Sequence, residues 1–321
     1  MTVALVVGSL HMDLIATATT LPTPDASVTG DAFTRSPGGK AGNQAVQLAR
    51  LGIPTTLLAR VGADLFGDEL VAAMAEKGVD TSRIARDPVL PTGASAVLSA
   101  GGEYLSIIVP GASASLARAD LDGVPTSVEV VVAELELPVD VSTIVAGWAD
   151  ERGVPLVLNA SPLPDPIDPA ANEVVRSAST VVVNRAEAAL LSGREVESAA
   201  DANAAAEIIT GHHGVTTVIV TLGSAGALCR HPVGIDYHPG WPVAVVDTVG
   251  SGDAFLATYV ASRIEGRSVP LSLERATAAG ALACTRSGAL AGIATADELQ
   301  AFIDRGPVYR NLSRGSTPKR P

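Results

Sequence analysis

The strongest chemical signal in the sequence is the segment 247–255, which reads Asp-Thr-Val-Gly-Ser-Gly-Asp-Ala-Phe. It follows an apolar run and opens a predicted helix over 251–264. Gly250 and Gly252 let successive backbone N–H groups converge into an anion-binding nest at the helix N-terminus. Asp253 has two interpretations: it complements the positive end of the helix dipole, or it is a general base beside developing phosphate charge. Glycine costs backbone entropy unless its geometry is used, so the two glycines favour the catalytic interpretation.

A second glycine turn leads into a predicted helix at residues 38–45, which read Gly-Gly-Lys-Ala-Gly-Asn-Gln-Ala. Gly38 and Gly39 permit the backbone to approach a ligand closely, and Lys40 and Asn43 offer donors to hydroxyls or anions. The alternative is an ordinary turn with an exposed lysine. The Walker A pattern is absent from the sequence, which disfavours a P-loop nucleotide fold.

Three other strand ends carry polar side chains. Residues 8–13 (Gly-Ser-Leu-His-Met-Asp) place Asp13 after the first predicted strand, where a dinucleotide-binding fold would have Gly-x-Gly-x-x-Gly. Asn184 and Glu187 stand at a predicted helix start, where they either cap the helix or orient water around Mg²⁺. The segment 221–226 (Thr-Leu-Gly-Ser-Ala-Gly) is a strand end and glycine loop that suits the approach of a flat nucleotide base.

Predicted strands and helices alternate along the chain, and the polar segments fall at their junctions. Continuous apolar runs, typical of strands covered on both faces, are Val3–Gly8, Thr55–Val61, Val128–Leu135, Val154–Asn159, Thr180–Asn184 and Val215–Leu222. Helical spacing with alanine-rich faces covers Ala41–Leu51, Phe66–Lys77, Ser198–Thr210, Ser251–Ile264 and Leu271–Thr285. This order predicts an α/β fold with a mainly parallel sheet and right-handed crossovers.

Two segments, about 14–36 and 88–110, contain strand-like pieces without intervening helices. Within the second, Ser95–Ala100 and Tyr104–Val109 predict a β-hairpin. Together the segments either form a small antiparallel sheet that projects as a lid over an active site, or extend the main sheet. We expect one domain over residues 1–310 and a flexible tail over 311–321.

The charge balance narrows the classes of partner. The 321 residues include 22 Lys and Arg and 34 Asp and Glu, which gives a formal net charge of −12. Such a chain lacks the basic face with which proteins bind nucleic acids and anionic lipids, so we expect neither nucleic acid nor membrane as a partner. The N-terminus lacks the pattern of a signal peptide, and the uncharged stretch 208–229 is interrupted by glycines and histidines. We therefore expect a soluble, cytoplasmic protein.

Segments 38–45 and 247–255, in this order, resemble the two signatures of the ribokinase-type (phosphofructokinase-B) carbohydrate kinase family, and residues 8–13 resemble its sugar-binding strand end. The similarity runs in register over nearly the whole chain. The resemblance implies a three-layer α/β/α sandwich with a mainly parallel sheet and a small β-sheet lid, which often serves as the interface of a homodimer. It also implies transfer of the γ-phosphate of Mg·ATP to a sugar hydroxyl, with D-ribose as the expected acceptor.

The resemblance assigns roles to individual residues. Asp253 would take the proton of the attacking hydroxyl, and the backbone amides of Gly250, Ser251 and Gly252 would stabilise the transferring phosphoryl group. The sugar-side positions are His11, Asp13, Gly39, Lys40, Asn43 and Glu136. The nucleotide-side positions are Asn184, Thr221, Gly223 and Gly226, with Glu187 near Mg²⁺ but not bound to it directly. A monovalent cation such as K⁺ would be held by Asp247, Val249, Cys284, Ser287 and Ala289.

Two departures from the family pattern bear on function. His11 replaces an Asn that contacts the sugar, and Gly292 stands where a Ser hydroxyl often completes the cation site. The alternatives are a related kinase for another sugar, a sugar acid or a nucleoside, and a non-catalytic sugar- or nucleotide-sensing module on the same fold. Asp253 and the intact glycine turn disfavour the sensing module, because a sensor has no need of the base.

Overall fold

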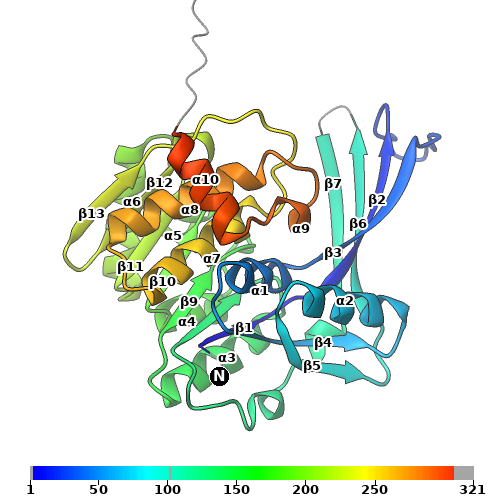
Figure 1. Ribbon diagram of the computed structural model, residues 1–321, viewed down its shortest axis with the longest axis horizontal. Coiled ribbons are helices and arrows are strands. Elements are labelled where there is room, and N and C mark those ends of the chain that lie inside the picture. The colour runs from blue at the N-terminus through cyan, green and yellow to red at the C-terminus, as the bar shows by residue number, and fades with distance from the viewer. Residues whose placement is uncertain (1–2, 101–102, 307–321) are drawn as a thin grey trace, which may run out of the picture.

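The computed structural model describes residues 3–100 and 103–306, and a nine-stranded sheet forms its centre (Figure 1). The spatial order is β13-β12-β11-β10-β9-β8-β1-β4-β5, and every pair from β11 to β5 is parallel. The hairpin β12–β13 closes one edge in antiparallel pairing. The strands are β1 (Ala4–Val7), β4 (Thr55–Gly62), β5 (Asp80–Asp87), β8 (Val130–Glu134), β9 (Leu156–Asn159), β10 (Thr180–Val183), β11 (Thr217–Thr221), β12 (Ala227–His231) and β13 (Gly234–His238).

Helices cover both faces of this sheet, because its strands present apolar side chains alternately to either side. In β1, Ala4 and Val6 face one hydrophobic core, while Leu5 and Val7 face the other. The first core is completed by α1 (Lys40–Arg50), α2 (Leu65–Glu76), α7 (Ser251–Ile264), α8 (Val269–Ala283), α9 (Ala289–Gly292) and α10 (Ala296–Arg305). The second is completed by α3 (Val139–Glu151), α4 (Pro169–Ser177), α5 (Arg185–Ser192) and α6 (Ala199–His213). The three-layer α/β/α sandwich is thereby confirmed.

All six predicted core strands and all five predicted helices are present, with ends displaced by a few residues. Thr180–Asn184 ends as a strand at Val183, because the Asn184 side chain caps α5 instead. No range was predicted for α3, α4, α9 or α10, and of α5 only the start at Asn184 was predicted. The uncharged stretch 208–229 divides into the end of α6, all of β11 and part of β12, as its glycines indicate. Within the described part of the chain, no helix is both long enough and apolar enough to cross a membrane.

A separate four-stranded sheet projects from the core beside α1 and α2, and we call it the lid (Figure 1). It contains β2 (His11–Ala18), β3 (Ala32–Gly38), β6 (Thr92–Ala100) and β7 (Glu103–Gly111), in the order β3-β2-β6-β7. The hairpin β6–β7 is the predicted one, and the lid does not extend the main sheet. The expectation of a wholly antiparallel sheet is wrong, because the central strands β2 and β6 both run outward from the core and pair in parallel.

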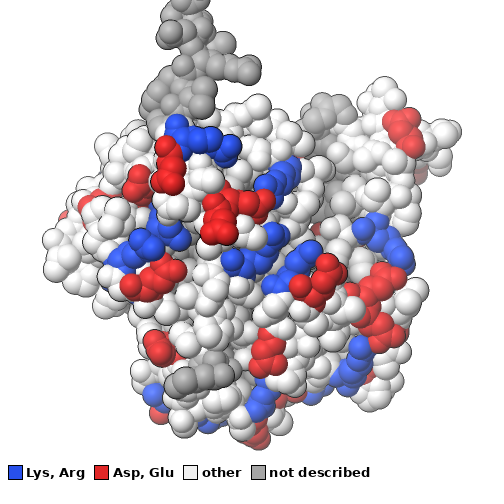
Figure 2. Space-filling view, in the orientation of Figure 1, with Lys and Arg blue, Asp and Glu red and all other residues white. Residues whose placement is uncertain are grey.

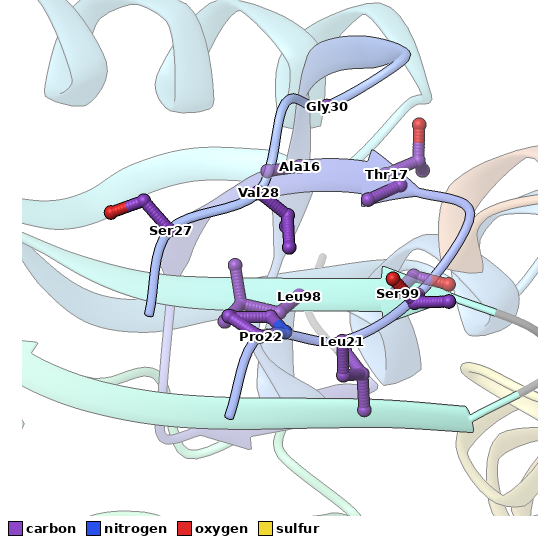
Figure 3. Close-up of a pocket in the computed structure, with 11 residues that line it drawn as sticks. Ala16, Thr17, Leu21, Pro22, Ser27, Val28, Gly30, Leu98 and Ser99 are labelled. Carbon is purple, nitrogen blue, oxygen red and sulfur yellow. The ribbon is translucent and has the colours of Figure 1, made fainter. Parts of the chain in front are cut away.

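The surface of the core mixes acidic and basic side chains on the face shown in Figure 2, whereas the projecting lid carries few charges there. A pocket of about 280 Å³ lies in the lid, between β2, β6 and the connection that precedes β3 (Figure 3). None of its lining residues is charged or belongs to the predicted site; they are Ala16, Thr17, Ala18, Thr20, Leu21, Pro22, Ser27, Val28, Gly30, Leu98 and Ser99. The predicted tail over 311–321, and the end of the predicted domain at 310, lie outside the described residues.

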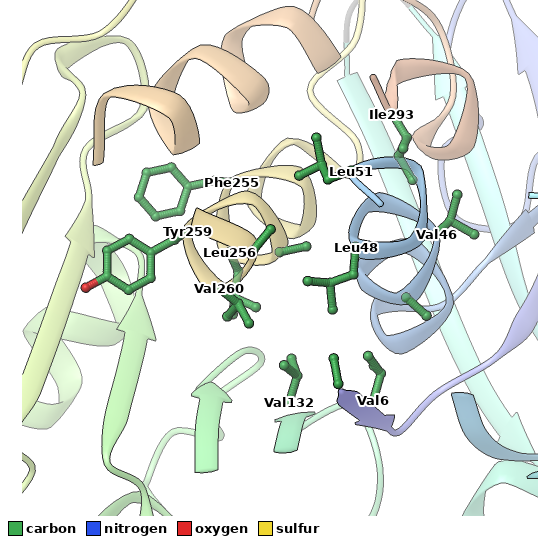
Figure 4. Close-up of a cluster of buried hydrophobic side chains, with 14 of the residues drawn as sticks. Val6, Val46, Leu48, Leu51, Val132, Phe255, Leu256, Tyr259, Val260 and Ile293 are labelled. Atoms are coloured by element: carbon green, nitrogen blue, oxygen red, sulfur yellow. The ribbon is translucent and has the colours of Figure 1, made fainter. Parts of the chain in front are cut away.

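The contact between α1 and α7 joins the two signature segments (Figure 4). Residues 253–262 of α7 are all buried, so this helix lies inside the layer, with α8 and α1 packed on it. Leu48 from α1 and Leu256 from α7 are fully buried in the same cluster, above Val6 of β1 and Val132 of β8. Apolar packing therefore sets the distance between the helix starts that carry Lys40 and Asp253.

We expect Leu48→Ala to lower the free energy of unfolding by about 2–5 kcal/mol, because it removes a fully buried side chain from this contact. Leu65→Ala in α2 is the matched control, since Leu65 is 62% exposed, and its effect should stay within about 0.5 kcal/mol. Urea denaturation of both variants measures the difference. Equal and small losses would contradict the packing described here.

Candidate active site

Asp253 is the third residue of α7 and one of the most enclosed carboxylates in the described structure, with 6% of the residue exposed. The Asn43 side chain donates from Nδ2 to its Oδ2 at 2.9 Å, and Gln44 donates from Nε2 to its Oδ1 at 2.9 Å. Burial raises the pKa of Asp253, while the charge of Lys40 and the two amide donors oppose that shift. Burial and a raised pKa are the properties expected of a carboxylate that acts as a general base.

The turn before Asp253 has the geometry of an anion-binding helix start. Gly250 is the N-cap residue with φ 76°, and a Cβ there would lie 2.9 Å from the Cβ of Ala289, so only glycine fits. The Ser251 N–H donates to the Thr248 carbonyl at 3.2 Å. Apart from the neighbouring residues and the backbone of its own helix, no described heavy atom lies within 4 Å of a Cβ built on Gly252. The first N–H groups of a helix lack intrahelical acceptors, so a helix start of this kind can bind an anion.

The segments assigned to a monovalent cation lie directly beside this turn. The Asp247 carboxylate accepts from the Val249 N–H at 3.0 Å and from the Gly288 N–H at 2.8 Å. The carbonyl of Cys284 accepts from the N–H groups of Val246 and Asp247. Ser287 is exposed, and Ala289 is the buried first residue of α9. The structure thus brings these residues together, and it joins them by hydrogen bonds of their own.

Lys40 is the first residue of α1 and is surrounded by acidic groups. Its Nζ lies 3.8 Å from Oε1 of Glu136, and its backbone N–H donates to Oε2 of the same residue at 3.1 Å. Burial lowers the pKa of Lys40, but the net shift is upward because of the neighbouring carboxylates: Asp253, Glu136, Glu134 and Glu187. The ammonium group is therefore held as a cation at the centre of an acidic cluster.

Glu134 is the last residue of β8 and Glu136 lies two residues beyond it, and both bond the segment that leads from the core into the lid. Glu134 is 1% exposed, accepts from the Ser9 N–H at 2.6 Å and accepts from the N–H of Glu136. The Ser9 hydroxyl donates to Glu136 at 2.5 Å and accepts from the Lys40 N–H at 3.0 Å. Burial, together with the charge of Glu136, raises the pKa of Glu134. This network fixes the chain between β1 and β2 against the start of α1.

His11 and Asp13 lie near the base of the lid, in β2 and not at the end of the first core strand as predicted. His11 Nε2 lies 3.1 Å from Oδ1 of Asp13, and the Ser95 hydroxyl donates to the same oxygen at 2.6 Å. Burial lowers the pKa of His11, but the Asp13 hydrogen bond and the nearby acidic charges outweigh it and raise the pKa. At neutral pH this histidine therefore has a stronger tendency to carry a proton than a free one.

The glycine pair before Lys40 is explained by the protein's own chain. A Cβ on Gly38 would lie 2.3 Å from the Asp13 carboxylate, and one on Gly39, where φ is 97°, would lie 2.5 Å from the Ser9 carbonyl. We predicted that these glycines admit a ligand. In the structure their immediate role is to let the lid strands and α1 pass each other closely.

Asn184, Glu187 and Thr221 lie at the C-terminal ends of neighbouring parallel strands. Asn184 and Glu187 form the capping box of α5, with bonds of 2.8 and 3.0 Å, so the structural interpretation of this pair is correct. Glu187 is only 6% exposed, and burial raises its pKa. The Thr221 hydroxyl donates to the Val183 carbonyl at 3.3 Å, and the loop that contains Gly223 and Gly226 is closed by the Leu222 N–H bond to the Gly226 carbonyl.

The charges of Asp253, Glu136 and Glu187 reach Lys40 and raise its pKa, so these four predicted residues share one region beside the carboxyl ends of β8 and β10, where open α/β sheets bind ligands. Sequence reasoning missed Gln44, Ser9 and Ser95, although Gln44 stands next to Asn43 in the quoted motif. Gln44 was missed because consecutive residues of a helix point about 100° apart, and only the angle of α7 lets both amides reach one carboxylate. In the described residues, no three His, Cys, Asp or Glu side chains form a group that could hold a metal ion by themselves.

Comparison with known proteins agrees with this geometry. Residues 1–296 match the description "pfkB family carbohydrate kinase". The chain is 30% identical over 304 residues to a ribokinase of Bacillus subtilis, covering 93% of this chain and 98% of the relative. It is 25% identical over 302 residues to a deoxyribokinase of Salmonella typhi, covering 93% and 97%. The structure of Arabidopsis thaliana ribokinase complexed with ribose and ATP superposes with a TM-score of 0.85 at 28% identity, covering 94% of this chain and 99% of that chain.

A family match over nearly the whole chain, a full-length relative at 30% identity and the fold agree with one another. Members of this family transfer a phosphoryl group to a hydroxyl acceptor. The chain therefore belongs to the pfkB family of carbohydrate kinases and is a phosphotransferase.

Proposed function

We propose that this enzyme transfers the γ-phosphoryl group of ATP to a hydroxyl of D-ribose, forming ribose 5-phosphate. The observation that carries the proposal is the buried Asp253 carboxylate at the start of α7, directly beside the open glycine turn at 250–252. The similarity to ribokinases, one of them solved with ribose and ATP, supports the choice of donor and acceptor.

In the proposed reaction Asp253 accepts the proton of the attacking sugar hydroxyl. The N–H groups at the start of α7 donate to the phosphoryl oxygens, where negative charge is carried in the transition state. Lys40 compensates the anionic groups around the acceptor site, and Asp13 and Asn43 offer hydrogen bonds to sugar hydroxyls. Positioning and electrostatic stabilisation account for most of the catalysis of phosphoryl transfer, and this site supplies both.

Mg²⁺ fits the chemistry of the nucleotide side. Mg²⁺ keeps several waters and needs few protein ligands, and the buried Glu187, whose pKa is raised by burial, offers a carboxylate on this side. Glu187 would therefore hold the ion through water, and the bound ion would neutralise charge on the phosphates. Asn184, Thr221, Gly223 and Gly226 are the residues we propose on the nucleotide side.

The fit to K⁺ is poorer. Both oxygens of Asp247 and the carbonyl of Cys284 already accept backbone N–H groups. Gly292 adds no hydroxyl, and a Cβ there would lie 2.9 Å from the Ala283 carbonyl. Hydrogen bonds within the protein hold this loop in shape.

We expect Asp253→Asn to lower kcat by about 100- to 10,000-fold while ATP binding survives, because the base is lost and the amide turn is kept. Asp297→Asn is the matched control: Asp297 is an exposed aspartate in the first turn of α10. If Asp253 only complemented the helix dipole, kcat would fall by a similarly small amount in both variants. Steady-state kinetics and calorimetric ATP binding distinguish the two roles, and near-normal turnover of Asp253→Asn would refute the mechanism.

An ADP-release assay over a panel of acceptors tests the substrate. We expect the highest kcat/KM with D-ribose among ribose, 2-deoxyribose, fructose, ketodeoxygluconate, adenosine and pseudouridine. His11→Asn should change the ranking of these acceptors more than the KM for ATP, because His11 and Asp13 lie on the lid side. A higher value for another acceptor would replace ribose and leave the kinase activity standing, whereas no ADP release with any acceptor would overturn both.

We also propose that two copies associate through the lid. One apolar row runs across one face of the lid, because neighbouring strands pair these residues with one another. In the strand order β3, β2, β6 and β7, the row consists of Phe33, Ala16, Leu98 and Leu105. Phe33 is 65% exposed, Leu105 57% and the neighbouring Ile107 70%. Contiguous exposed apolar surface of this kind marks a site of protein association.

Light scattering of the full chain should give the mass of a homodimer. Combining Leu105→Glu with Ile107→Glu should give a monomer, because burying two carboxylates at an interface is costly. Val233→Glu, at a residue 89% exposed between β12 and β13, should leave the dimer intact. A monomeric mass of the unaltered protein would contradict the association.

A further inference from the structure

Among the described residues, Gln44 makes one side-chain hydrogen bond, and that bond goes to the proposed base. The residue has no solvent exposure, and its Nε2 donates to Oδ1 of Asp253 at 2.9 Å. Asn43, the preceding residue, donates to the other oxygen at the same distance. Each oxygen of the carboxylate is thus held by its own amide, and both amides come from one turn of α1.

The acceptor ends of these two amides are unusual. Asn43 Oδ1 and Gln44 Oε1 are buried, and neither has a hydrogen-bond partner among the described residues. Buried amides in folded proteins normally satisfy both ends. Gln47, one turn further along α1, does so: its Nε2 donates to the Ala294 carbonyl at 3.1 Å, and its Oε1 accepts from the Ala294 N–H at 3.3 Å. The contrast indicates that Gln44 is placed for what it donates and not for the stability of the helix.

We propose that Gln44 is a positioning residue for phosphoryl transfer, which fixes the orientation of the Asp253 carboxylate and keeps it ionised. The proposal rests on the proposed function of Asp253 as the base. Gln44 acts through Asp253, since a side chain with no exposed surface is not available to touch the sugar or the nucleotide. Asn43, which retains 5% exposure, is left to serve both the carboxylate and the acceptor.

The electrostatic surroundings of Asp253 explain why a neutral donor matters there. Burial is the largest influence and raises the pKa of Asp253, and the nearby charge of Glu136 acts in the same direction. Lys40 and the two amides act in the opposite direction. The ammonium of Lys40 is shared with Glu136 at 3.8 Å, so the amides are the donors in direct contact with the carboxylate. Removing one of these amides should therefore let burial raise the pKa of Asp253 further.

The test compares two substitutions of the same kind in one helix. Gln44→Met removes the amide at nearly constant volume, and Gln47→Met does the same at the structural glutamine. We expect Gln44→Met to lower kcat at neutral pH by about 10-fold or more and to move the acid limb of kcat/KM upward by about one pH unit. The KM for ATP should change little. Gln47→Met should lower the thermal midpoint and leave the pH of the acid limb where it is.

A second substitution keeps the test decisive if Gln44→Met does not fold. Gln44→Glu has the same shape, and while its carboxyl is protonated it donates to Asp253 as the amide does. When that carboxyl ionises, the donor is lost and like charges repel. We therefore expect Gln44→Glu to be active at low pH and to lose activity as pH rises, so that its alkaline limb moves downward while the acid limb of Gln44→Met moves upward.

Pairing these profiles with Asp253→Asn separates the two claims. If Gln44→Met and Gln44→Glu both keep the unaltered pH profile and kcat while Asp253→Asn is inactive, the positioning role is overturned and the base remains. If Asp253→Asn retains normal turnover, the base itself is wrong. Opposite shifts of the two limbs in the Gln44 variants, with no shift in Gln47→Met, would establish the role of Gln44.

Discussion

A carboxylate buried within the contact of two apolar helices is the constraint on which the rest of this structure depends. Asp253 is buried where α1 packs on α7, and burial by itself favours the protonated acid. Two amide donors and the charge of Lys40, all from the first turns of α1, oppose that tendency. Because hydrogen bonds tolerate little change in distance, the apolar packing between the helices has to be exact to a few tenths of an ångström. Packing and chemistry are therefore one arrangement.

The acidity of the chain is compatible with a polyanionic substrate for the same reason. A protein with a net charge of −12 and three lysines carries no overall positive charge to attract phosphate. In our proposal, the phosphate side of this site relies on backbone amides at a helix start and on Mg²⁺. Lys40, the one lysine within a signature segment, is surrounded by four carboxylates that raise its pKa. The charge of Lys40 balances the acidic side chains around it, and the surface as a whole contributes little to phosphate binding.

The lid belongs to the same network, because its strands begin and end within the site. The chain leaves β1, passes Ser9 and enters the lid at His11, and it returns from the lid at Gly38, just before Lys40. Ser9 bonds Glu136 and Lys40, and Asp13 bonds Ser95 in the neighbouring lid strand. These bonds join the base of the lid to residues that we propose on the acceptor side. The outer part of the lid is apolar and exposed, which fits a role in association.

Local patterns in the sequence determined the α/β architecture, since continuous apolar runs indicate buried strands and helical spacing of apolar residues indicates helices. Local patterns also determined the two glycine turns. The two family signatures can also be read from the sequence, and the role of Asp253 as the base is an expectation that rests on their resemblance to the family. Only the tertiary structure decided that β2 and β6 pair in parallel, that Gly38 and Gly39 make room for Asp13 and Ser9, and that Gln44 contacts Asp253. Residues 44 and 253 are far apart along the chain, and the angle at which two helices cross leaves no signal in either segment alone.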